Sequence, residues 1–123
     1  MNETGSDDET ERGQMLHLAD VKLQVGENTS VSRHTRYKAI FDSVYIRLVA
    51  EARGAGCPEP TRHPSERIVS AGAAAAALDQ ESLDEVLALF RVAEDHRYNP
   101  GTHPGNVLHA LALARHIAEW VKR

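Results

Sequence analysis

Residues 39–52 read AIFDSVYIRLVAEA and decide the fold. Their apolar side chains recur every three or four residues, which is the spacing of one face of an α-helix. The face is wide enough to pack against two neighbouring helices. The stretch therefore predicts the central helix of a helical protein. Its apolar face comprises Ile40, Phe41, Val44, Tyr45, Leu48, Val49 and Ala52.

Capping residues and breaks set the limits of this helix. Ser30 or Ser32 can cap its start, and the Gly/Pro-rich segment Gly54–Pro60 ends it. Before it, the amphipathic segment Met15–Leu23 predicts a short first helix that ends at Gly26.

Two further helices are expected after the break. Pro64 suits the first position of a third helix that continues to about Ala77. A fourth helix starts at Asp79 or at Ser82, and Ser82-x-x-Glu85 matches a capping box. Its apolar face comprises Leu83, Val86, Leu87 and Phe90.

A second break separates the fourth helix from the last one. Pro100 disfavours helical geometry at Asn99, so the fourth helix should end near Tyr98. A fifth helix then runs from Thr102–Pro104 almost to Arg123. Because no segment alternates with a period of two, we expect an all-α, up-and-down bundle of four or five helices.

Composition limits the other possibilities. The 123 residues fit one domain. The first twelve residues hold five acids and one arginine, which predicts a disordered acidic tail over 1–12 and a helical domain over 13–123. The net charge of −4 argues against simple nucleic-acid packing, and the single Cys57 excludes an intrachain disulfide. We see no signal peptide or membrane span, and therefore expect a cytoplasmic protein with no membrane partner.

The chemistry is concentrated in Arg91-x4-His96-x-Tyr98, near the end of the fourth helix. Arg91 and Tyr98 are seven residues apart and share a face, whereas His96 is displaced by about 140°. One pocket can therefore hold Arg91 and His96 only if the helix unwinds before Asn99 or if two subunits pair. The alternative is a solvated face, on which Arg91–Asp95 and Glu94–Tyr98 are ordinary i,i+4 pairs.

The chain resembles the HEPN family (higher eukaryotes and prokaryotes nucleotide-binding domains) over roughly residues 15–122. The resemblance rests on the segment Arg36–Tyr45, on the Gly-rich turn with the His63 segment after it, and on Leu87–Phe90 leading into the Arg91 motif. The terminal helix after Tyr98-Asn99-Pro100-Gly101 completes it.

The resemblance implies a fold and a function. Catalytic family members are metal-independent ribonucleases whose site is built across a homodimer. Arg91 would hold the phosphate, and His96 would transfer protons at the RNA 2′-hydroxyl and the leaving oxygen. In toxin–antitoxin members, a nucleotidyltransferase antitoxin modifies the tyrosine that matches Tyr98. The chain is thus expected to be a toxin-type endoribonuclease with RNA, a second copy and an antitoxin as partners.

The motif departs from the family pattern at two positions. Val92 follows the arginine where the family often has a polar residue, and Asp95 precedes the histidine where it often has an apolar one. Many members lack the catalytic residues, so a non-catalytic binding or dimerisation module is the alternative. The C-terminal half also resembles a small accessory helical domain of transglutaminase-like membrane proteins.

The remaining histidines give no pattern for a metal or a cofactor. His109 and His116 lie seven residues apart without a carboxylate at helical spacing between them, and no zinc-binding motif is present. We therefore expect no metal and no cofactor. A Ser/His/Asp triad stays possible, although no nucleophile-elbow pattern supports it.

Overall fold

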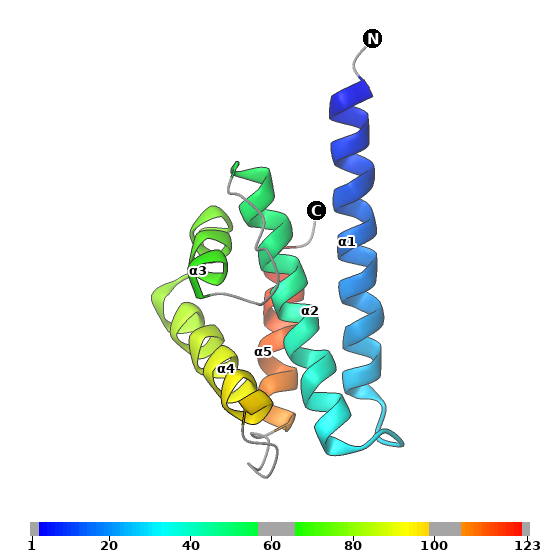
Figure 1. The fold of residues 1–123 in the computed structure, drawn as a ribbon, viewed down its shortest axis with the longest axis vertical. Helices are drawn as coiled ribbons and strands as arrows, with labels where there is room; N and C mark the ends of the chain where they lie inside the picture. The colour runs from blue at the N-terminus through cyan, green and yellow to red at the C-terminus, as the bar shows by residue number, and fades with distance from the viewer. Residues whose placement is uncertain (1–2, 57–65, 99–106, 122–123) are drawn as a thin grey trace.

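The computed structural model describes residues 3–56, 66–98 and 107–121; within these, side chains are described except at 3–9 and 93–98. This part of the chain contains five helices and no strand, which confirms the all-α class. Figure 1 shows α1 on one side of α2, and α3 and α4 on its other side. The helices are α1 (Glu3–Glu27), α2 (Arg33–Gly54), α3 (Glu66–Ala75), α4 (Gln80–Tyr98) and α5 (Val107–Trp120).

Helix α2 lies at the centre and contacts each of the other four helices. The predicted stripe is confirmed, since Ile40, Val44, Leu48 and Ala52 are all at most 2% exposed. Fully burying a valine, leucine or isoleucine side chain stabilises the fold by about 1.5–3 kcal/mol. The core is completed from α4 and α5, by Val86, Leu89, Phe90, Leu111, Ala114 and Ile117 among others.

The start of α2 matches one of the two predicted caps. Ser32 has extended backbone angles, and its hydroxyl oxygen accepts a 3.2 Å hydrogen bond from the Thr35 N–H. This bond satisfies one of the free N–H groups in the first turn of the helix. Ser30 lies in the preceding turn, where its N–H donates to the Asn28 side chain.

The α3–α4 corner differs from the expected capping box. Ala77 adopts a left-handed φ of 57°, and the Leu78 N–H bonds back to the Ala73 carbonyl, which closes α3. Asp79 then caps α4, because its carboxylate accepts a 2.8 Å hydrogen bond from the Ser82 N–H. Ser82 is therefore inside the first turn and not the cap, so the capping-box alternative was wrong and the Asp79 alternative was right.

Helix α1 begins at Glu3, where the sequence suggested a disordered tail up to residue 12 and a short helix from Met15. Contacts with α2 explain part of the added length. Arg12 pairs with Glu51, and Glu11 pairs with Arg53. These partners are about forty positions away in sequence, so local composition gives no sign of them.

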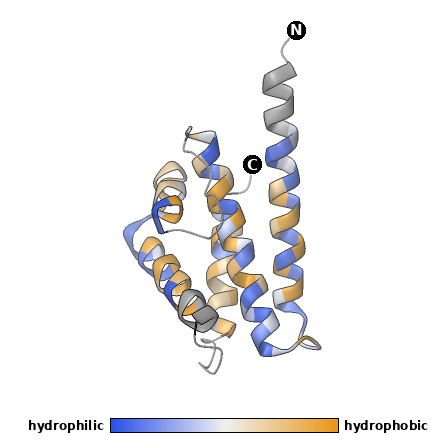
Figure 2. Ribbon diagram, viewed as in Figure 1, coloured by the Kyte–Doolittle hydropathy of each residue, from blue (hydrophilic) through white to orange (hydrophobic). Residues whose placement is uncertain are grey.

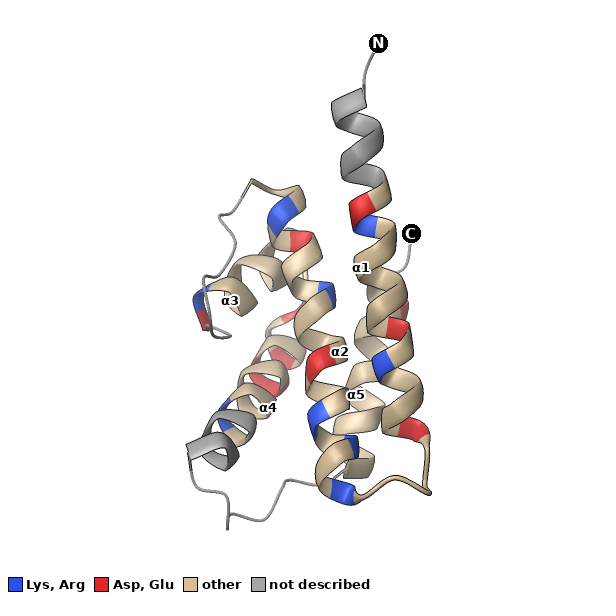
Figure 3. Cartoon of the chain, turned by 45° about the vertical axis from the view of Figure 1, so that its right-hand side comes forward, with Lys and Arg blue, Asp and Glu red and all other residues tan. Residues whose placement is uncertain are grey.

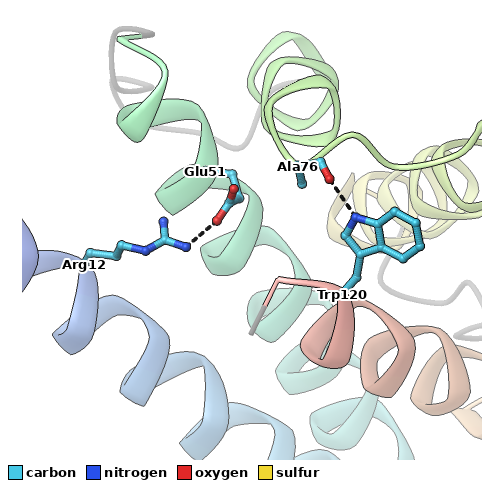
Figure 4. A network of polar contacts seen from close by, with 4 residues as sticks. All are labelled: Arg12, Glu51, Ala76 and Trp120. Carbon is cyan, nitrogen blue, oxygen red and sulfur yellow. Dashed lines mark hydrogen bonds and ion pairs between the residues drawn. The ribbon is translucent and has the colours of Figure 1, made fainter. Parts of the chain in front are cut away.

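Helix α5 packs against α2 with a strongly apolar inner face, and its hydrophobic colouring is visible behind α2 in Figure 2. It begins at Val107, and the predicted start at Thr102–Pro104 lies outside the described residues. Its last residue, Trp120, donates a hydrogen bond from its indole N–H to the Ala76 carbonyl (Figure 4). The end of α5 thereby holds the end of α3.

Candidate functional site

Arg91 lies on the solvent side of α4. Its side chain is 64% exposed, and its Nε–H donates to the Glu66 carboxylate across 3.4 Å. Glu66 is the first residue of α3 and is itself 46% exposed. An exposed ion pair of this kind contributes about 0–1 kcal/mol. The guanidinium is therefore accessible and only weakly held.

The side chains of His96 and Tyr98 lie outside the described residues, and so do those of Glu94 and Asp95. The backbone there is described, and α4 remains helical through Tyr98. The helix does not unwind between Arg91 and its end. Of the two routes to a shared pocket, only the pairing of two chains is compatible with this helix.

A second polar cluster joins α4 to α5. Ser82 Oγ lies 3.2 Å from His116 Nε2, and the Ser82 side chain is buried at 7% exposure. Hydrogen bonds from the Ser82 hydroxyl and from its backbone N–H hold the pKa of Asp79 below its usual range, and the nearby His116 adds to this effect. The Trp120 ring lies against the His116 ring, with centroids 5.7 Å apart.

This cluster has the composition of a Ser/His/Asp triad but not its connectivity. In a triad the carboxylate orients the histidine, which then accepts the serine proton. Here the Asp79 carboxylate binds Ser82 itself. Asp79 therefore holds Ser82 and not the His116 ring, which contacts Ser82 Oγ separately. We interpret the cluster as an extended cap for α4.

The two histidines of α5 face different partners. His109 Nε2 lies 3.5 Å from Glu85 Oε1, whereas His116 faces Ser82. Across the described ranges, no three His, Cys, Asp or Glu side chains gather in a way that suits a metal ion. The sequence did not indicate the Ser82–His116 contact, because a separation of 34 residues leaves no local signal.

Comparison with models of protein families, with curated proteins and with solved structures found no match. The HEPN resemblance thus stays a prediction that rests on the Arg91 motif and its surroundings. Within the described part of the chain, no helix combines the length and the apolar character needed to cross a bilayer.

Proposed function

We propose that this protein is a HEPN-type, metal-independent endoribonuclease whose site forms between two copies of the chain. The observation that carries the proposal is the unbroken helix from Arg91 to Tyr98. It separates positions 91 and 96 on one chain, while Arg91 projects a largely exposed guanidinium into solvent. A second chain can then supply the histidine that the first chain does not bring to Arg91.

The roles follow from the chemistry of the side chains. The planar guanidinium of Arg91 can bind two phosphate oxygens and stabilise the negative charge that develops during cleavage. His96 can take the proton from the RNA 2′-hydroxyl as its oxygen attacks phosphorus, or give a proton to the 5′-oxygen that leaves.

Tyr98 fits a regulatory role in the same site. It lies seven residues after Arg91, on the same face of α4. A nucleotide attached to its hydroxyl by a nucleotidyltransferase antitoxin would bring a phosphate towards Arg91. That phosphate would compete with RNA for the guanidinium, which gives modification a direct way to silence the enzyme.

One observation favours the alternative, a non-catalytic helical module for binding or dimerisation. Glu66 already pairs with Arg91, and Glu94 and Asp95 lie within the motif, between Arg91 and His96. In this alternative the motif is a charged surface of α4, and substitutions in it change neither fold nor chemistry.

Cleavage of RNA in the presence of EDTA separates the two functions. We expect the wild-type protein to cleave a single-stranded RNA, and His96→Ala to lower the rate by about a hundred- to ten-thousand-fold. His109→Ala is the matched control, because His109 is an exposed histidine on α5 and should leave the rate unchanged. Equal rates for wild type and His96→Ala, or no cleavage by either, would favour the non-catalytic module.

A further inference from the structure

Charge is unevenly divided between the first two helices. Helix α1 holds seven acidic and two basic residues, which gives −5, whereas α2 holds five basic and two acidic residues, which gives +3. The net charge of the whole chain is −4, so α1 carries more negative charge than the entire protein. Over residues 10–27, where its side chains are described, α1 holds three acidic and two basic residues, and Figure 3 shows charged residues along both helices.

Arginines of α2 bind acceptors on α1 at several positions along the two helices. The acceptors are two carboxylates and one carbonyl oxygen, each bound by a different guanidinium. The pairs are Arg53 with Glu11 at 2.6 Å, Arg47 with Asp20, and Arg36 Nε with the Gly26 carbonyl at 2.9 Å. Farther along, Arg115 of α5 binds Glu27 at 2.9 Å.

Two ion pairs between the same helices have the opposite polarity. Arg12 of α1 binds Glu51 (Figure 4), and Lys22 of α1 lies 3.8 Å from Asp42. Opposite charges placed in both directions fix the register of one helix on the other, because a shifted helix would bring like charges together. Helix α1 therefore has one preferred position on α2.

The α2 face beneath α1 contains polar groups that α1 does not satisfy. Arg47 is 3% exposed, and its Nε has no hydrogen-bond partner. Ser43 lies one turn earlier on the same face, is fully buried, and its hydroxyl also has no partner. Burying a donor without an acceptor costs free energy. The cover that α1 provides is thus energetically incomplete at these two side chains.

Three apolar side chains of α1 pack on the body of the protein. Ala19 is the fully buried hydrophobic residue of its described part, while Leu16 and Leu23 are partly buried. Leu18 and Val21 are 46% and 40% exposed, so they face solvent. Ion pairs add to these contacts, and those in which at least one partner is exposed are each worth about 0.2–1 kcal/mol.

We infer that α1 is a displaceable acidic cover and that the α2 face beneath it binds the phosphate backbone of single-stranded RNA. The face consists of Arg36, Ser43 and Arg47, with Arg53 at its edge. Arg36, Ser43 and Arg47 follow one another at steps of seven and four residues, so they lie in one row along α2. In this state a phosphate accepts the Arg47 Nε–H and the Ser43 O–H, which have no partner under α1.

The ligand class rests on the proposed function, whereas the face itself rests on the contacts between α1 and α2. The face is also separate from the proposed cleavage site, since α1 and α4 lie on different sides of α2 (Figure 1). Binding to this face can consequently be measured in a protein that does not cleave.

The test uses the full chain in a His96→Ala background and a fluorescent 16-nucleotide RNA at low salt. The variant Glu11→Gln/Asp20→Asn weakens the ion pairs of α1 with Arg53 and Arg47. We expect it to bind RNA about fivefold more tightly than the parent protein. Its matched control is Glu81→Gln/Glu119→Gln, which changes the net charge equally at exposed residues of α4 and α5. The control accounts for the general attraction between RNA and a less acidic protein.

Two further measurements identify the face. Adding Arg47→Gln to the Glu11→Gln/Asp20→Asn variant should remove its increase in RNA affinity. If Arg47→Gln does not fold, Arg36→Gln repeats this test at a partly exposed position. Hydrogen exchange should show α1 amides losing protection when RNA binds, while amides of α5 stay protected.

Three results would overturn the inference. The first is an equal gain in the control pair, and the second is an α1 that stays protected in the RNA complex. The third is no RNA binding by the Glu11→Gln/Asp20→Asn variant, including the case in which it only dimerises by exchanging α1 between copies. Because cleavage by the wild-type chain is measured separately, failure of this inference is distinct from failure of the proposed function.

Discussion

The indole N–H of Trp120 donates a 2.6 Å hydrogen bond to the carbonyl oxygen of Ala76 (Figure 4). Trp120 is the last residue of α5, and Ala76 directly follows α3. The carbonyls at a helix end lack partners within the helix, so this bond satisfies one of them. One turn earlier, His116 contacts Ser82 in the first turn of α4. The end of α5 therefore holds both sides of the α3–α4 corner.

Replacing the tryptophan should loosen this corner. Trp120→Phe keeps an aromatic ring but removes the donor, so we expect the free energy of unfolding to fall by about 1 kcal/mol. Urea denaturation followed by circular dichroism measures the change. Leu108→Ala, at a side chain that is 73% exposed, is the comparison and should stay within about 0.5 kcal/mol of wild type. If both variants unfold alike, the Trp120 bond contributes nothing.

A methyl group at Gly72 should be poorly tolerated. A Cβ at this position would overlap the backbone carbonyl of Leu48, so α3 could no longer pack closely on α2. We expect Gly72→Ala to lower the free energy of unfolding by about 1–3 kcal/mol, the usual cost of overpacking. Gly13→Ala is the control, since a Cβ there meets nothing within 4 Å, and it should stabilise α1 by about 0.5–1 kcal/mol. A stabilised Gly72→Ala protein would show that the α2–α3 contact is looser than described.

Stability should decrease in alkaline solution through Tyr37. Burial raises the pKa of Tyr37 from 10.0 to about 12. A phenol whose pKa is higher in the folded state binds its proton more tightly there, so its contribution is complete below pH 10 and is lost as the pH rises towards 12. The difference in unfolding free energy between wild type and Tyr37→Phe should stay constant below pH 10 and shrink above it. A difference that does not change across this range would contradict the assignment.

The helices of the core could be predicted because their signals are local. Ile40, Val44 and Leu48 repeat at helical spacing, and their burial determines which side of α2 faces the core. Ser32 was one of two candidate caps, and only the geometry of the turn distinguishes it from Ser30. In the same way, whether Asp79 or Ser82 caps α4 depends on the left-handed turn at Ala77, and no sequence signal predicts that turn.

The features that sequence reasoning missed depend on partners far along the chain. Glu11 and Arg12 belong to a helix held by residues of α2, whereas composition alone suggested a solvated tail. The pairing of Arg91 with Glu66 and that of Ser82 with His116 likewise join separate helices. For the proposed site, the sequence supplied the motif, and the structure adds the exposure of Arg91 and the continuity of α4.

The central claim is that Arg91 of one chain and His96 of another form one site, and a mixing experiment tests it most directly. Arg91→Ala and His96→Ala chains are co-expressed with different tags, and the mixed dimer is purified. It retains one intact pair of Arg91 and His96 out of two, so we predict about half the RNA cleavage rate of the wild-type dimer, although each variant alone is inactive. A mixed dimer as inactive as its parents, or a wild-type chain that is monomeric and inactive, would contradict the account.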